Sequence, residues 1–91
     1  MKLPNKFADE VLSYQVDWSE RLASGEVITA VLVKITSGTI TVGPPASRWS
    51  GNVVIFWLSA GTVAEVIQGL IEVTTSSGEI IAEPFSLYIP G

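Results

Sequence analysis

Apolar and polar residues alternate along most of this chain, and such a two-residue period predicts β-strands. Leu12, Tyr14 and Val16, for example, share one face of a strand expected over residues 10–17. Further strands are expected at residues 27–36, 39–42, 53–58, 64–75 and 79–89. Turn signals containing Gly and Ser separate these runs about every ten residues, as is usual in sandwiches. The pattern therefore predicts an all-β fold, an antiparallel β-sandwich of six to eight short strands with Greek-key or hairpin connections.

One stretch predicts helical rather than extended backbone. Asp17 is followed three residues later by Glu20, and such a pair can form a capping box. We therefore expect one short helical turn near residues 18–23, which Gly25 would end.

Proline marks the places where strands should be interrupted. Residues 43–51 hold two prolines and two glycines, so a loop is expected there. Pro84 is a candidate break in the last strand. Residues 1–9, which contain Pro4, are expected to form an extended N-terminal lead-in, and residues 10–91 a single β-sandwich domain.

The same alternation predicts the core. Trp18 is expected to close one end of it, since buried aromatic rings dominate the energetics of small domains. Gly69 falls on the stripe of Ile67 and Ile71, where it can leave room for Trp18 or another large ring. The residues expected to point inward are Leu12, Tyr14, Val16, Trp18, Val31, Val33, Phe56, Leu58, Ile67, Ile71, Val73, Phe85, Leu87 and Ile89.

Charge and residue type narrow the possible partners. The 91 residues include 9 acidic and 5 basic side chains, a formal net charge of −4, and no Cys or His. An acidic chain without clustered Lys and Arg is poorly suited to nucleic acid or to an anionic membrane, so neither is expected as a partner. The start of the chain lacks the apolar region of a signal peptide, and no apolar run could span a bilayer.

Few residues could support catalysis. The close acidic pairs are Asp9 with Glu10 and Asp17 with Glu20, and we assign the first to a solvated edge and the second to a helix cap. The three lysines lie in no nucleophile motif, and there is no glycine-rich phosphate loop or calcium-loop pattern. We therefore expect no catalytic residue, no metal ligand, no cofactor and no enzyme activity.

The chain is instead rich in apolar residues, which make up 47% of it. The strand expected at 53–58 is apolar on both faces, although a sandwich strand needs only one apolar face. Either the domain itself or a neighbouring subunit covers the second face, and we favour a neighbour. Trp49 is either an interface residue beside Arg48 or a ring folded back over the sandwich edge. The interface candidates are Arg48, Trp49, Val53, Ile55, Trp57, Ile80 and Tyr88.

Several segments resemble a known family. The stretch DEVLSYQVDWS at residues 9–19 resembles the DEVLDYxxDWS opening of small tail-associated proteins of tailed bacteriophages, described as fiber-tail adaptors. The resemblance continues in GEVIT at 25–29, FWLSAGT at 56–62 (family pattern close to VWLSGGT), VTTSSG at 73–78 and FSLYI at 85–89 (family pattern SFTLRI-like). It spans almost the whole chain, and the Tyr-x-x-Asp-Trp-Ser and Trp-Leu-Ser-x-Gly-Thr pieces are specific in combination.

The resemblance implies an immunoglobulin-like virion structural protein of the tail or neck, without catalytic residues. Such a protein would be made in the host cytoplasm and would contact other virion proteins and copies of itself. Residues 53–55 are more apolar than the Thr-rich family strand, and residues 79–81 are less charged than usual, which strengthens the case for a partner. The alternatives are a carbohydrate- or receptor-binding surface module, with Trp49, Trp57 or Tyr88 stacking on sugars, and a capsid decoration protein.

Overall fold

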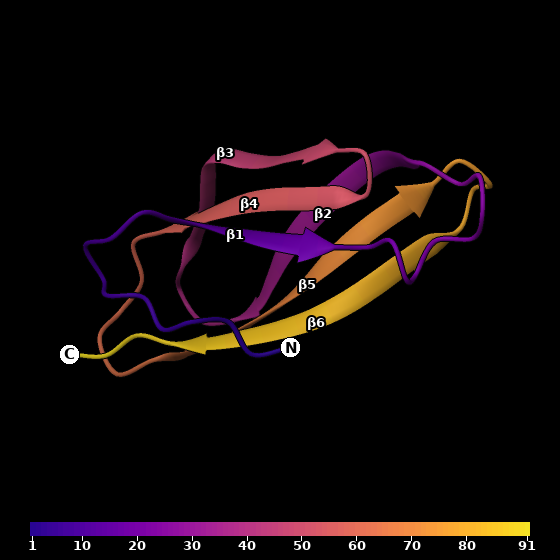
Figure 1. The fold of residues 1–91 in the computed structure, drawn as a ribbon. Helices are drawn as coiled ribbons and strands as arrows, with labels where there is room; N and C mark the ends of the chain where they lie inside the picture. Colours follow the sequence, from indigo (N-terminus) through magenta and orange to yellow (C-terminus); the bar gives the residue numbers. More distant parts are fainter.

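Two three-stranded antiparallel sheets face each other in the computed structural model, which describes all 91 residues (Figure 1). The first sheet has the order β1-β4-β3, with β1 at Leu12–Asp17, β3 at Thr41–Ser50 and β4 at Val53–Ser59. The second sheet has the order β2-β5-β6, with β2 at Ile28–Ser37, β5 at Val66–Thr75 and β6 at Ile80–Tyr88. The expected all-β sandwich is confirmed, with six strands.

The core lies between the sheets, where alternate residues of each strand point inward. Three rings join its two halves: the centroids of Tyr14 and Phe56 are 5.7 Å apart, and those of Phe56 and Phe85 are 5.5 Å apart. Ten of the fourteen residues expected to point inward are buried. The other four are half-buried and pack against the core: Leu12, Val16, Val31 and Val33.

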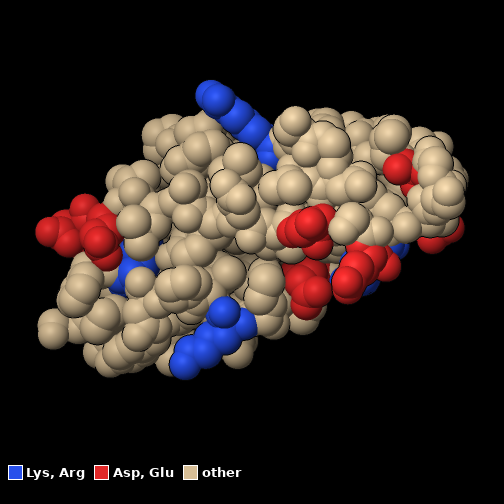
Figure 2. Space-filling model, viewed as in Figure 1, with Lys and Arg blue, Asp and Glu red and all other residues tan.

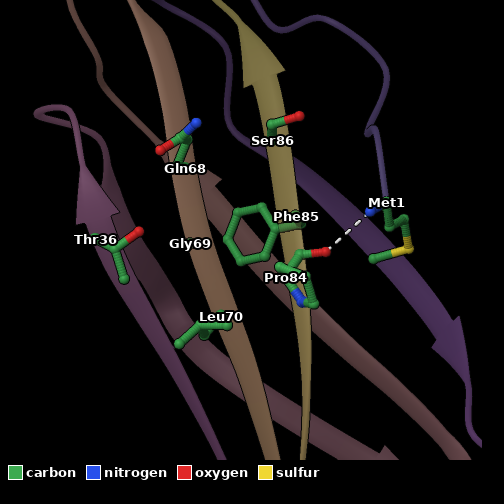
Figure 3. A pocket seen from close by; sticks show the side chains of 8 residues that line it. All are labelled: Met1, Thr36, Gln68, Gly69, Leu70, Pro84, Phe85 and Ser86. Carbon is green, nitrogen blue, oxygen red and sulfur yellow. Dashed lines mark hydrogen bonds between the residues drawn. The ribbon is translucent and has the colours of Figure 1, made fainter.

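Gly69 lies against the Phe85 ring, as Figure 3 shows, so the large ring for which it leaves room is Phe85 and not Trp18. A β-carbon on Gly69 would lie 2.7 Å from Cε1 of Phe85 and 2.6 Å from the main-chain oxygen of Lys34. Real β-carbons essentially never come this close to other atoms. Only glycine therefore fits here without a local shift.

The expected loop at residues 43–51 is wrong, because β3 runs through both prolines. Val42 pairs with Leu58 and Ser47 pairs with Phe56, so the ladder skips the residues Gly43–Ala46, which form a bulge. β3 is an edge strand, so no neighbouring strand needs a hydrogen bond from the main chain on its outer side. A proline, which has no N–H, is tolerated there. The two prolines therefore interrupt the pairing without ending the strand.

The expected break at Pro84 is also wrong, since β6 continues through it, paired with Leu70 of β5. Ser86, two residues further on, directs its main-chain N–H and C=O away from β5, toward the N-terminal residues. Pro84 shares that orientation, because hydrogen-bonding direction repeats every two residues in a strand. The nitrogen of Pro84 therefore points away from β5, and the pairing of β6 with β5 does not need the N–H that proline lacks.

The expected helical turn near residues 18–23 is a single turn that no helix continues. The carbonyl of Trp18 accepts hydrogen bonds from the N–H groups of both Arg21 and Leu22, at 2.9 and 3.1 Å. Asp17 accepts from the N–H of Ser19 at 2.9 Å, so the expected capping box with Glu20 does not form. Trp18 itself is 1% exposed and closes its end of the core, as predicted.

Residues 1–9, here called the N-terminal strap, lie along the free edge of β6 (Figure 1). The N–H of Leu3 donates to the carbonyl of Ser86 at 2.8 Å, and the N–H of Ser86 donates to the carbonyl of Met1 at 2.9 Å. The pairing is parallel. The strap therefore covers main-chain groups that an edge strand would otherwise expose.

Side chains anchor the strap to the first sheet as well. The buried ammonium of Lys6 donates to the carbonyls of Ala60 at 2.6 Å and Phe7 at 2.7 Å. The hydroxyl of Tyr14, on β1, donates to the carbonyl of Pro4 at 3.2 Å. The strap thus closes the side of the sandwich where β6 of one sheet lies nearest β1 of the other.

Candidate protein–protein interface

An apolar row, formed by Val53, Ile55 and Trp57, runs along the outer face of β4. The inward neighbours of these residues are completely buried, whereas the three members of the row are only half-buried. β4 is the central strand of its sheet, so the row is covered at its sides by β1 and β3 but not from above. The second apolar face of this strand is therefore not enclosed within the protomer.

Polar residues of β1 border one side of the apolar row. Ser13 lies opposite Trp57, Gln15 opposite Ile55 and Asp17 opposite Val53, and all three are exposed. Asp17 brings the only charge on this side. Hydrogen bonding to the N–H and hydroxyl of Ser19 lowers the pKa of Asp17 below its usual value. The carboxylate is thus ionised at neutral pH and directed toward its own turn.

Arg48 borders the other side of the apolar row, from β3. It lies opposite Ile55, and its guanidinium is 5.8 Å from the centroid of the Trp57 ring, within cation–π range. Trp57 itself faces the bulge of β3, because the residues before and after it pair with Ser47 and Val42. Arg48 and the bulge together hold the indole at the edge of the row.

Few charges lie over the first sheet. In Figure 2, which has the view of Figure 1, uncharged surface covers most of β3 and β4, whereas acidic groups lie toward both ends of the molecule and near the end of β1. A weakly charged apolar strip with one basic residue resembles the centre of protein–protein interfaces, which are depleted of charge and enriched in Trp and Arg.

Trp49 lies apart from this surface, on the opposite face of β3. Its indole Nε1 donates to the carbonyl of Ile28, on β2, at 3.2 Å, so the ring bridges the two sheets. Of the two arrangements predicted for Trp49, the structure has the ring folded back over the sandwich edge, with 42% of the residue exposed. It does not join Arg48, its neighbour in sequence, because successive side chains of a strand point to opposite faces.

Ile80 and Tyr88 lie on the outer face of the second sheet, near opposite ends of β6. They are 67% and 39% exposed. The structure therefore brings four of the seven interface candidates together, on the first sheet: Arg48, Val53, Ile55 and Trp57. Whether any of the seven meets a partner stays a prediction.

A hollow of about 420 Å³ lies on the second sheet, close to the N-terminus (Figure 3). The local sequence does not indicate it, because it depends on Met1 lying against β6, more than 80 residues away along the chain. No ionisable side chain lines it, and the ammonium of Met1 donates to the carbonyl of Pro84 at 3.0 Å. Its lining is Met1, Thr36, Gln68, Gly69, Leu70, Pro84, Phe85 and Ser86.

The remaining ionisable groups with shifted pKa values have structural roles. Burial lowers the pKa of Lys6, against the opposing effect of Glu10 and Asp9, and burial together with Glu10 raises the pKa of Tyr14. Hydrogen bonds from Ser77, Thr75 and the N–H of Ala23 lower the pKa of Glu26.

No three His, Cys, Asp or Glu side chains lie close enough together to hold a metal ion. No helix of the structure is long and apolar enough to cross a membrane.

A comparison of the sequence with known protein families identifies the family of the chain. Residues 6–88 match the model of the family described as podophage GP4 fiber-tail adaptor protein gp77. The chain belongs to this family. The fiber-tail adaptor family supports a structural role in the virion tail and suggests a non-enzymatic protein. No curated protein matches the chain.

Proposed function

We propose that this fiber-tail adaptor joins components of the phage tail or neck through the outer face of its first sheet. The observation that carries the proposal is the apolar row of Val53, Ile55 and Trp57, left half-buried at the centre of that sheet. Covering it would stabilise a complex by about 25 cal/mol for each Å² of apolar surface removed from water. The weakly charged border adds little desolvation cost.

Arg48 gives this surface its specificity. A guanidinium beside an indole offers a partner both a flat apolar surface and hydrogen-bond donors, and Arg and Trp are the residues most enriched among interface hot spots. Since Arg48 is the basic residue on this face, an acidic or carbonyl-rich partner segment fits it best. The partners we propose are other tail, neck or fibre proteins and copies of the chain itself, with no nucleic acid and no membrane.

The fold fits a module of this kind. We infer that the sandwich is immunoglobulin-like, because the orders β1-β4-β3 and β2-β5-β6 correspond to strands B-E-D and C-F-G of an immunoglobulin constant domain. The N-terminal strap differs from strand A of that domain, because it pairs with the last strand and not with β1, the counterpart of strand B. In this interpretation residues 10–91 form one domain, made in the host cytoplasm and then built into the virion tail.

A sugar-binding module fits the geometry less well. Stacking on a sugar needs aromatic rings grouped on one surface. Trp57 lies on the first sheet, Trp49 between β3 and β2, and Tyr88 on the second sheet, so the three rings form no platform.

Particles made with altered chains test the proposal. Ile55→Asp puts a charge in the middle of the apolar row, and Gln68→Asp puts the same charge at an exposed position of the second sheet. We expect Ile55→Asp particles to contain at least about tenfold less of the chain and of the tail fibre, since a buried unpaired charge is costly. Gln68→Asp particles should match the wild type. Mass spectrometry of purified particles measures both, and the melting temperature of each isolated variant checks its fold.

The location of the chain is the second measurement. Electron cryo-microscopy of wild-type particles should place its density in the tail or neck. Density on the capsid shell would instead establish a decoration protein and overturn the proposal. Full fibre content in particles of folded Ile55→Asp would exclude the apolar row, and glycan binding by the isolated chain that Trp57→Ala abolishes would favour the receptor-binding alternative.

A further inference from the structure

The four edges of the two sheets are protected very unequally. The strap covers the edge of β6, and the Gly43–Ala46 bulge with its two prolines breaks the edge of β3. β1 has six residues with polar side chains on its outer face. β2 has ten residues, Ile28–Ser37, without a proline. Long apolar edges are the ones onto which other strands add, and natural proteins usually blunt them.

The side chains of β2 make the inward face of its edge apolar and place one large apolar residue on the outer face. Leu32, on the outer face, is 53% exposed. Val31, Val33 and Ile35 point inward but stay half-buried, because no strand lies beyond them. The one charged residue, Lys34, already pairs with Glu72 of β5 at 2.9 Å.

The neighbouring strand covers only one end of this edge. Trp49 of β3 binds the carbonyl of Ile28, at the start of β2. From there the two strands diverge, so that the far end of β2 lies well away from β3 in Figure 1. Residues 30–36 of β2 are therefore the open part of the edge.

We propose that the open edge of β2 binds the same edge of a second copy of this chain, antiparallel, to make one continuous six-stranded sheet. A strand pairs with its own copy about a two-fold axis, and the open part is centred on Val33. In that register Val33 meets Val33 of the partner subunit and Val31 meets Ile35 of the partner subunit. All inward contacts across the new pair are then apolar.

The same register separates the charges. Lys34 lies opposite Leu32 of the partner subunit and not opposite another lysine, so its aliphatic stem covers the exposed leucine. The main-chain groups of both edges gain partners at the same time. A second copy thus supplies the length, apolar pattern and charge spacing that this edge needs, on a surface separate from the apolar row.

Sedimentation of the isolated chain tests the pairing. The wild type should form dimers as its concentration rises. Leu32→Lys places two lysines directly opposite each other on each side of the axis, and we expect it to weaken the dimer by about tenfold or more. Val11→Lys is the matched control, because Val11 is similarly exposed, at 57%, and lies outside β2. This control should dimerise like the wild type.

Cross-linking tests the register. The chain has no cysteine, so Val33→Cys introduces a single thiol at the proposed two-fold axis. Opposite residues of an antiparallel pair have Cα atoms about 4.5–5.5 Å apart, which suits a disulfide. Mild oxidation should link Val33→Cys into dimers and leave Ala82→Cys, at an exposed position of β6 away from both proposed surfaces, monomeric.

Three results would overturn the inference. One is a wild-type chain that stays monomeric up to about millimolar concentration, a range in which weak dimers form. Another is a dimer unaffected by Leu32→Lys but lost in Ile55→Asp, which would place self-association on the apolar row. The third is equal cross-linking of Val33→Cys and Ala82→Cys. None of these bears on where the chain lies in the virion, so this inference and the proposed function can fail separately.

Discussion

The ammonium of Lys6 lies 2.6 Å from the main-chain oxygen of Ala60, and this bond links the N-terminal strap to the turn after β4. Lys6 is fully buried, and its second acceptor is the carbonyl of Phe7. A buried ammonium is costly unless it is hydrogen-bonded, so the two carbonyl partners hold Lys6, and with it the strap, in this conformation.

Replacing this side chain should loosen the strap. We expect Lys6→Met to lower the free energy of unfolding by about 1–3 kcal/mol, because methionine fills the space but leaves the carbonyls of Ala60 and Phe7 without a donor. Lys2→Met, at an exposed position of the same strap, should change it by less than about 0.5 kcal/mol. Urea unfolding of the three proteins measures both values. Equal stability of all three would show that the buried ammonium does not hold the strap.

Tyr14 should make the stability of the fold depend on pH in the alkaline range. Burial holds the pKa of Tyr14 above its ordinary value of 10.0 in the folded chain, so the folded state keeps this proton longer than the unfolded state. The resulting stability is fully present below pH 10.0 and is lost as pH rises through the raised folded pKa. Wild type should therefore lose more stability above pH 10.0 than Tyr14→Phe. Unfolding at pH 7 and at several values above 10 measures this, and parallel pH curves for the two proteins would contradict it.

Gly69 cannot accept a side chain. Gly69→Val should destabilise the fold by about 1–3 kcal/mol or more, because the new β-carbon meets both the Phe85 ring and the carbonyl of Lys34. Thermal unfolding measures the effect. Gln68→Val, next to it on the exposed face, is the control and should stay within about 0.5 kcal/mol of wild type. Wild-type stability of Gly69→Val would mean that this part of the sheet is not closely packed.

Trp49 should matter for folding more than for binding. Trp49→Phe removes the hydrogen bond to Ile28 and should lower the free energy of unfolding by about 0.5–1.5 kcal/mol. Trp57→Phe keeps an aromatic ring beside Arg48 and should have the smaller effect on stability. If Trp49→Phe is as stable as wild type but its particles lose fibres, Trp49 is an interface residue.

The sequence predicted the strands because burial in a sandwich alternates residue by residue. Phe56 and Leu58 follow this rule and are completely buried. Gly43–Ala46 was assigned to a loop because prolines weaken ladders, but an edge strand tolerates them when a bulge removes the affected residues from the pairing.

The features that the sequence did not predict depend on contacts between segments far apart along the chain. Nothing around Lys6 in the sequence indicates burial, since Ala60, one of its two acceptors, is 54 residues away. Leu3 is buried for the same kind of reason, outside any alternating run. For the candidate interface, alternation placed Val53, Ile55 and Trp57 on one face, but only the register of β3 showed that Arg48 joins them while Trp49 turns away.

The strap also decides how the molecule would respond to mechanical load. It runs parallel to β6, so tension between the two ends of the chain would pull these neighbouring segments in opposite directions along their length. Their hydrogen bonds would then be sheared together and not unzipped one after another. In the proposed role as a joint of the phage tail, the strap would therefore oppose a pull on the two chain ends with all of its bonds at once.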